Sequence, residues 1–186
     1  RSFDMVLPNG ERWAFLKPIM FAGGIGQIDD RHTAKAEPER GMRILQIGGP
    51  AYRVGFGGGA ASSMLQGENV AELDFNAVQR GDAEMEQKMN RVIRACNEMG
   101  AGSLIEVIHD QGAGGPGNVL KELVEKTGGH IDIRRIRVGD PTMSVLEIWV
   151  AEYQERNGLL VRAQNMPHFE AICEREKVGC ENLGAV

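Results

Sequence analysis

A short segment near the middle of the chain combines a carboxylate with a run of glycines. Residues 109–115 read His-Asp-Gln-Gly-Ala-Gly-Gly and follow the apolar run 104–108. Glycines let backbone N–H groups approach a ligand closely, and the free N–H groups at a helix start attract phosphate. Asp110 would supply the kind of oxygen ligand that Mg2+ uses beside phosphate oxygens. The segment therefore predicts a metal site with Gly112 and Gly114 as phosphate-loop candidates, although Asp110 could instead merely cap a turn.

Another segment, residues 48–63, reads Gly-Gly-Pro-Ala-Tyr-Arg-Val-Gly-Phe-Gly-Gly-Gly-Ala-Ala-Ser-Ser. Its glycines and hydroxyls resemble an anion-binding turn, and the candidates for phosphate contact are Gly58, Gly59, Ser62 and Ser63. The string matches neither a P-loop, which needs Gly-Lys-Ser/Thr, nor the dinucleotide fingerprint in its usual setting. Close packing of a helix on a strand explains the glycines equally well.

Two other segments are dense in polar groups. Gln79, Arg80 and Asp82 lie just before the strongest helical pattern of the chain, so their side chains and the free N–H groups of that helix could converge on one ligand. A capped helix start with surface polar residues is the plainer interpretation. Residues 151–156, Ala-Glu-Tyr-Gln-Glu-Arg, could likewise form an ordinary turn. Neither the histidines nor the cysteines show a catalytic or metal-ligand spacing, so no nucleophile is indicated.

Composition narrows the class of protein. The chain has 186 residues, with 21 Lys and Arg against 26 Asp and Glu, a net charge of −5 and no block of like charge. A nucleic-acid partner is therefore disfavoured. No apolar run approaches the length that crosses a bilayer, and residues 1–20 lack a signal-peptide pattern, so we expect a cytoplasmic protein without membrane contact. The three cysteines are expected to be ordinary thiols.

Strand and helix patterns alternate from Met42 onward and predict a layered fold. Strands are expected at 42–47, 52–56, 104–109, 131–136, 159–161 and 183–186, and helices at 60–64, 82–98, 118–126, 144–149 and 166–176. The most secure helix begins at Asp82, because its apolar residues form one stripe and Asp82 is a good N-cap. Ser144 with Glu147 fits a capping box. We predict an α+β fold of α/β/α layers, with a mixed sheet flanked by helices.

The first forty residues follow a different pattern. They contain one strand-like run, 19–22, which is too little to make a fold alone. The polar stretch 29–41 contains Pro38, as a surface connection should. We therefore expect residues 1–40 to be the tail and linker of a preceding domain, and residues 41–186 to form the main domain.

Taken together, five strings are similar to the long form of phosphoribosylformylglycinamidine synthase. They are KPIMFAGGIG, GGPAYRVGFGGGAASS, LDFNAVQRGDAEMEQKMNRVIRAC, HDQGAGGPGNVLKEL and GDPTMSVLEIWVAEYQER, and the resemblance runs in order from about Lys17 to the end. That enzyme is much longer, so the resemblance implies an internal piece of its synthetase region. The implied fold is that of aminoimidazole ribonucleotide synthetase: residues 1–40 would end an N-terminal-type domain, and 41–186 would form the C-terminal-like domain.

The resemblance also implies an activity. The family is an ATP-dependent ligase of purine biosynthesis that converts formylglycinamide ribonucleotide, ATP and glutamine-derived ammonia to formylglycinamidine ribonucleotide. Mg2+ would be the cofactor and ATP a co-substrate. The partners would be the rest of the same polypeptide, a second synthetase half and a glutaminase domain. The family's catalytic histidine and ATP-binding loop would lie upstream and its glutaminase cysteine downstream, so no catalytic residue is expected here and the piece alone should be inactive.

Carried over by motif, the resemblance assigns individual positions. Gln79 would contact the nucleotide substrate, Asp110 would bind magnesium, and the substrate segment would be Glu152, Tyr153 and Gln154. Tyr153 departs from the serine of shorter bacterial forms, and Pro116 removes one N–H donor from the glycine loop. An alternative is that this half of a duplicated core has only a structural or nucleotide-holding role.

Overall fold

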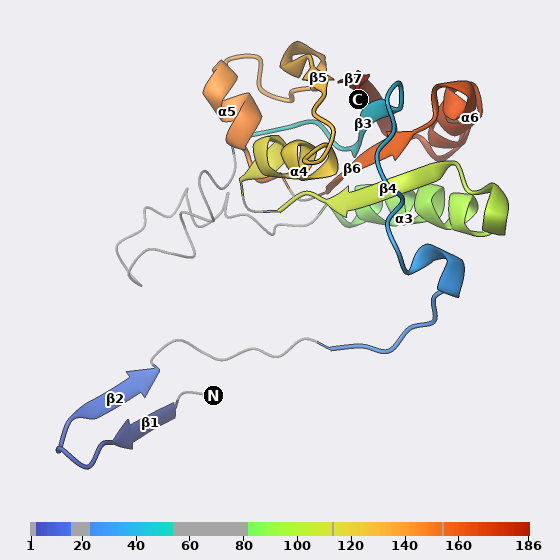
Figure 1. Ribbon diagram of the computed structural model, residues 1–186. Coiled ribbons are helices and arrows are strands. Elements are labelled where there is room, and N and C mark those ends of the chain that lie inside the picture. The colour runs from blue at the N-terminus through green and yellow to red at the C-terminus, as the bar shows by residue number, and fades with distance from the viewer. Residues whose placement is uncertain (1–2, 16–22, 54–81, 113, 154) are drawn as a thin grey trace.

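The computed structural model describes residues 3–15, 23–53, 82–112, 114–153 and 155–186 (Figure 1). The strands are β1 (Phe3–Val6), β2 (Arg12–Phe15), β3 (Arg43–Gly48), β4 (Ile105–Asp110), β5 (His130–Ile131), β6 (Arg156–Val161) and β7 (Gly179–Ala185). The α-helices are α3 (Ala83–Asn97), α4 (Gly115–Leu123), α5 (Val145–Val150) and α6 (Met166–Glu176). The 3-10 helices are η1 (Asp30–His32), η2 (Gly100–Gly102), η3 (Ile133–Arg135) and η4 (Ala163–Asn165).

A five-stranded sheet forms the centre of the main domain. Its strand order is β4-β6-β3-β7-β5, and every neighbouring pair of these strands is antiparallel. The expectation of a mixed sheet is therefore wrong for the described strands, where the parallel pairing amounts to one isolated bridge between Ala51 and Val138. Alternation of strands and helices along the sequence indicates the layers, but it does not fix the direction of each strand.

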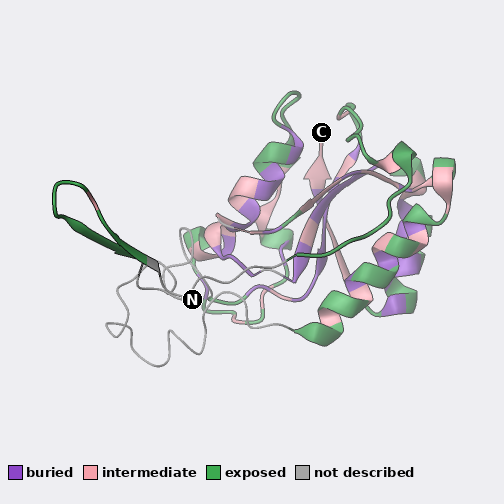
Figure 2. Cartoon of the chain, turned by 90° about the horizontal axis from the view of Figure 1, so that it is seen from below, coloured by how far each residue is buried: buried purple, intermediate pink, exposed green. Residues whose placement is uncertain are grey.

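Helices cover both faces of the sheet, so the predicted α/β/α layering is confirmed. Helices α4 and α5 pack on one face, where Ile44, Leu160 and Leu183 belong to the same buried apolar cluster. Helices α3 and α6 pack on the other, against Leu45 and Leu159. Neighbouring strand residues thus alternate between two cores, as the pleat requires. Figure 2 shows the buried residues concentrated on the sheet and on the helix faces turned towards it.

The helices with clear end signals are the ones that the sequence predicts best. Helix α3 begins after Asp82, whose carboxylate accepts from the N–H of Met85 at 3.0 Å. Helix α5 has the predicted capping box of Ser144 and Glu147. Helix α6 has the predicted bounds and carries a proline in its first turn. The caps satisfy N–H groups that the helix itself leaves unpaired, which is why they mark its start.

Two predicted strands are wrong. The run 131–136 contains strand only at β5, and residues 133–135 form η3, because Asp132 accepts from the N–H of Arg134 at 3.0 Å and turns the chain. Tyr52 and Arg53 do not belong to a strand, and the remaining residues of that prediction, 54–56, lie outside the described residues. The predicted strand 19–22 and helix 60–64 also lie outside them.

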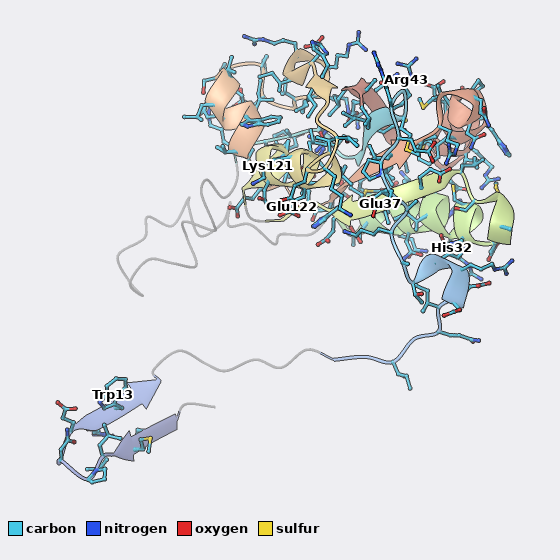
Figure 3. All side chains as sticks on the ribbon, viewed as in Figure 1. Trp13, His32, Glu37, Arg43, Lys121 and Glu122 are labelled. Carbon is cyan, nitrogen blue, oxygen red and sulfur yellow. The ribbon has the colours of Figure 1, made fainter. Side chains whose placement is uncertain are left out.

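A two-stranded hairpin precedes the main domain and was not predicted. Strands β1 and β2 pair antiparallel, and the chain turns between them at residues 7–11. The hairpin exposes large apolar side chains, and the Trp13 side chain labelled in Figure 3 is 63% exposed. Among the described residues, no helix combines the length and apolar character that a bilayer span requires.

The two-sided core leads to a first prediction, on stability. Leu160 in β6 is fully buried, so Leu160→Ala should lower the free energy of unfolding by about 2–5 kcal/mol through lost burial and a residual cavity. Leu146 in α5 is 69% exposed, and Leu146→Ala should change the free energy of unfolding by less than about 0.5 kcal/mol. Urea unfolding of both variants measures the difference, and equal costs would contradict the described core.

Candidate functional site

One end of the sheet gathers the segments that the sequence singles out. Asp110 at the end of β4 pairs with Asn157, while Gly48 at the end of β3 pairs with both Arg156 and Gly179. We call this end of the sheet the rim. Helices α3 and α4 begin at the rim and α5 ends there, since their flanking residues contact its loops. The rim therefore brings the carboxyl ends of two strands beside the starts of two helices.

The glycine turn after β4 packs directly against residues 151 and 152. Gly114 and Gly115 have φ values of 83° and 57°, which favour glycine, and a Cβ at Gly115 would lie 2.4 Å from the carbonyl oxygen of Ala151. The N–H of Gly114 donates to Glu152 Oε1 at 3.2 Å. The turn thus needs its glycines for close backbone approach, and it holds the buried Glu152 carboxylate.

Gln111 connects this turn to the rest of the rim through four hydrogen bonds. Its side-chain amide donates to the carbonyl oxygens of Ala151 at 3.2 Å and Tyr153 at 2.9 Å. Its side-chain oxygen accepts from the amide of Gln46, and its backbone N–H donates to the carbonyl of Arg156 at 3.0 Å. Both glutamine side chains are buried. Gln111 therefore fixes three separate parts of the chain, two through its side chain and one through its backbone N–H.

The ends of the other two polar segments meet at Glu155. The N–H of Gly49 donates to the Glu155 carbonyl at 3.1 Å, and the N–H of Asp82 donates to its carboxylate at 3.1 Å. Gly49 also lies under the ring of Tyr153, because a Cβ there would be 2.9 Å from that ring. The Tyr153 ring in turn meets Tyr52 edge to face, with 5.7 Å between ring centroids.

Asp110 presents its carboxylate to solvent. The side chain is 89% exposed, with its Oδ1 atom 3.6 Å from Nδ1 of His109, whose Nε2 lies 2.8 Å from Glu122 Oε2. The described residues contain no group of three metal-ligating side chains. The donor set at Asp110 is thus one accessible carboxylate, which fits the way Mg2+ is held by one or two carboxylates, waters and substrate phosphates.

A buried ion pair lies beneath the rim. Arg156 is fully buried, and its Nη2 donates to Glu181 Oε2 at 2.9 Å. Burial lowers the pKa of Arg156 and raises the pKa of Glu181. Arg137 lies 3.6 Å from the same carboxylate and donates to the Gly48 carbonyl at 2.8 Å. The cluster therefore anchors the strand end from which the glycine-rich segment departs.

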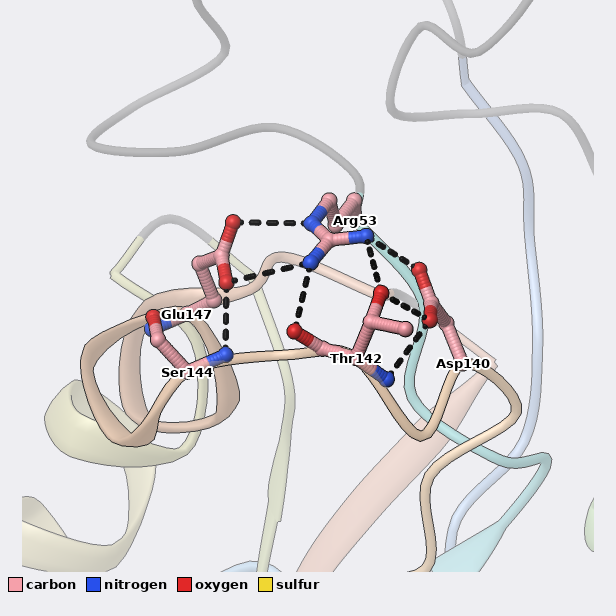
Figure 4. Close-up of polar contacts among 5 residues, drawn as sticks. All are labelled: Arg53, Asp140, Thr142, Ser144 and Glu147. Atoms are coloured by element: carbon pink, nitrogen blue, oxygen red, sulfur yellow. Dashed lines mark hydrogen bonds and ion pairs between the residues drawn. The ribbon is translucent and has the colours of Figure 1, made fainter.

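Arg53 fastens that departing segment to the loop before α5 (Figure 4). Its guanidinium donates to Glu147 Oε1 at 2.8 Å, to the Thr142 carbonyl at 2.8 Å and to the carboxylate of Asp140. Glu147 also closes the capping box with Ser144. The Arg53 hydrogen bond, together with those from Ser144, lowers the pKa of Glu147 to about 2. Arg53 thus ties the segment that follows β3 to helix α5, which leads to residues 151–153.

The predicted site residues fall into two groups. The structure brings together Asp110, Gly112, Gly114, Glu152 and Tyr153, while Gly58, Gly59, Ser62, Ser63, Gln79 and Gln154 lie outside the described residues. Sequence reasoning missed Gln111 and Gln46 as connecting residues. Gln46 gives a signal that could have been used, since it is a polar residue inside an otherwise apolar strand.

A second prediction tests why the turn contains glycine. Gly115→Ala and Gly128→Ala both place a side chain at positive φ, but only at Gly115 does the new Cβ clash with backbone, since nothing lies within 4 Å at Gly128. Gly128→Ala should cost about 1 kcal/mol of stability, and Gly115→Ala about 1–3 kcal/mol more. Urea unfolding compares them, and equal costs would show that the described contact with Ala151 is absent.

A third prediction concerns the Arg53 cluster and pH. Folding lowers the pKa of Glu147 from 4.5 to about 2, so its contribution to stability is complete above pH 4.5 and is lost as the pH falls towards 2. Arg53→Met should therefore lower the melting temperature by about 2–4 °C at pH 7, and this deficit should shrink between pH 4.5 and pH 2. Arg94 forms an exposed ion pair on α3, and Arg94→Met should change the melting temperature by less than about 1 °C. A pH-independent deficit for Arg53→Met would contradict the role given to Glu147.

Comparison with known proteins identifies the family of the main domain. The chain matches the family "AIR synthase related protein, C-terminal domain" over residues 39–186. Over all 186 residues it is 60% identical to an Arabidopsis thaliana protein named probable phosphoribosylformylglycinamidine synthase, chloroplastic/mitochondrial, and it covers 13% of that protein. It is 56% identical to the human phosphoribosylformylglycinamidine synthase, of which it covers 14%.

A solved structure shows the same fold. The structure named T. maritima PurL complexed with FGAR is 26% identical, with a TM-score of 0.69, over 85% of this chain and 26% of that one. The chain thus spans only about an eighth of the length of its curated relatives. Because the family match extends through all strands of the sheet and the helices on both of its faces, the chain belongs to the AIR synthase related proteins, as their C-terminal domain.

Proposed function

We propose that this chain is a segment of an ATP-dependent ligase that makes formylglycinamidine ribonucleotide from formylglycinamide ribonucleotide and glutamine-derived ammonia. Relatives at 56–60% identity over its whole length carry the name of that enzyme. The observation that supports the proposal best is the rim itself. There, the glycine turn and residues 151–153 are joined by Gln111 beside the exposed carboxylate of Asp110.

The proposed roles follow from exposure and contacts. Asp110 would hold Mg2+, which would supply positive charge beside the phosphate oxygens of the ligands. Gly112 and Gly114 would offer backbone close to phosphate, since a small turn leaves room for it. Glu152 is buried and accepts from the N–H of Gly114. It would therefore affect substrate binding indirectly, by holding the turn in place.

The residues outside the described part would complete the site. Gln79 and Gln154 would contact the nucleotide substrate, and Gly58, Gly59, Ser62 and Ser63 would lie near phosphate. The described residues Gly49, Asp82 and Glu155 meet at the rim, because Gly49 and Asp82 both donate to Glu155, which follows Gln154 in the sequence. In this proposal, residues 1–40 end a preceding domain and residues 41–186 form the domain that carries these contacts. ATP, ammonia, the second synthetase half and the glutaminase domain would come from the rest of the enzyme.

Glutamine-dependent synthesis by the full-length enzyme provides the fourth prediction. Asp110→Asn and Gln79→Ala should each lower kcat/KM by about 100-fold, since each removes a group that orients the reacting phosphate or substrate. Glu125→Gln, an exposed carboxylate change just after α4, should stay within about twofold. A chain of residues 1–186 alone should form no product. Activities of Asp110→Asn and Gln79→Ala within a few-fold of wild type would refute the site assignment.

A further inference from the structure

A cavity of about 530 Å3 lies along the outer edge of β4, away from the rim. Its walls come from residues 28–36, the end of α3, η2 and β4, and no described residue of the candidate site lines it. In Figure 1 the chain that leaves η1 crosses β4 before it enters β3. The volume lies within the range of about 300–1,000 Å3 that is typical of small-molecule sites.

The segment that covers the cavity is tied to the domain. The N–H of Ala36 donates to the Glu106 carbonyl at 3.4 Å. Arg162 bonds both carboxylate oxygens of Glu39 at 2.8 Å and also Glu106 at 2.8 Å, and Lys126 pairs with Glu37 at 2.7 Å. Several contacts therefore hold residues 36–39 beside β4, so the cavity is already formed before any ligand enters.

The lining of the cavity is partly apolar and partly polar. Ile93, Ile105 and Ile108 line it from α3 and β4, and Arg31, His32 and Lys35 line it from residues 28–36. Figure 3 shows His32 on η1.

Two of the charged side chains that line the cavity are paired with other residues. Arg162 bonds Glu106 while also bonding Glu39, and Asp29 occupies Nε and Nη2 of Arg31. Lys35 also lines the cavity and forms no ion pair with any described residue. The ammonium of Lys35 is therefore available to an anionic group in the cavity.

We propose that this cavity binds a small amphiphilic anion, with a compact apolar body against the isoleucines and one carboxylate, sulfonate or phosphate towards Lys35. The combination of an apolar wall and a few convergent donors is the usual composition of a small-molecule site. The inference is independent of the proposed ligase activity, because it uses none of the residues of the rim.

Binding of 8-anilinonaphthalene-1-sulfonate, a fluorescent probe of this chemistry, tests the proposal as a fifth prediction. The 186-residue chain should bind one equivalent saturably, and Lys35→Glu should weaken the affinity about tenfold, because it places a negative charge at the anion. Lys121→Glu, the same charge change on α4 (Figure 3), should alter it less than about twofold. Ala101→Trp should abolish binding by filling the cavity, which keeps the test valid if Lys35→Glu does not fold.

Methyl NMR of the same chain locates the probe. Titration should shift the methyl resonances of Ile93, Ile105 and Ile108, and inorganic phosphate alone should not compete, because it lacks an apolar body. Shifts confined to the β1–β2 hairpin would overturn the proposal. Equal affinity in wild type and Ala101→Trp would do so too, as would displacement by phosphate. Neither measurement uses the activity of the full-length enzyme. Failure of the anion-binding proposal therefore leaves the ligase proposal intact, and failure of the ligase proposal leaves the anion-binding proposal intact.

Discussion

The candidate site depends on the hydrogen bonds made by the side chain and the backbone N–H of Gln111, a buried residue. Its four hydrogen bonds reach Gln46 in β3, the Arg156 carbonyl in β6 and the carbonyls of Ala151 and Tyr153. A buried donor or acceptor left unpaired costs about 1–3 kcal/mol, so the segments cannot separate without losing several such bonds. The exposed Asp110 next to it therefore projects from a backbone whose position is fixed, which is the condition for a weakly anchored carboxylate to serve as a ligand.

The rim is assembled on polar contacts, whereas the sheet is held by apolar burial. The two apolar clusters lie on opposite faces of the sheet, but at the rim buried polar and charged side chains replace them: Gln46, Gln111, Glu152, Glu155 and Arg156. Such groups are tolerated in the interior when they are paired, as Arg156 is with Glu181 and Glu152 with the N–H of Gly114. The interior therefore changes from apolar to polar at the end of the sheet that carries the candidate site.

The sequence predicts the helices better than it predicts the sheet. Asp82, Ser144 and Pro167 signal helix starts by chemistry that is local to each helix, and the structure has these starts. Strand direction depends on contacts between residues far apart in sequence, so the antiparallel pairing of β3 with β6 and β7 was not available from the pattern. The 133–136 run was misread because Asp132 turns the chain despite its β-branched neighbours.

The glycines show why a motif can be located without its mechanism being known. The sequence predicts the turn at 112–115 as a phosphate loop. In the structure, Gly115 is required for a different reason, since the carbonyl of Ala151 lies against it and leaves no room for a side chain. Gln111 sits inside the same motif, and only the folded structure shows that it joins four partners. The packing role and the proposed contact with phosphate can coexist, since both depend on the small size of the glycines. Packing of the turn and its proposed contact with phosphate therefore have a single physical origin, the absence of side chains at its glycines.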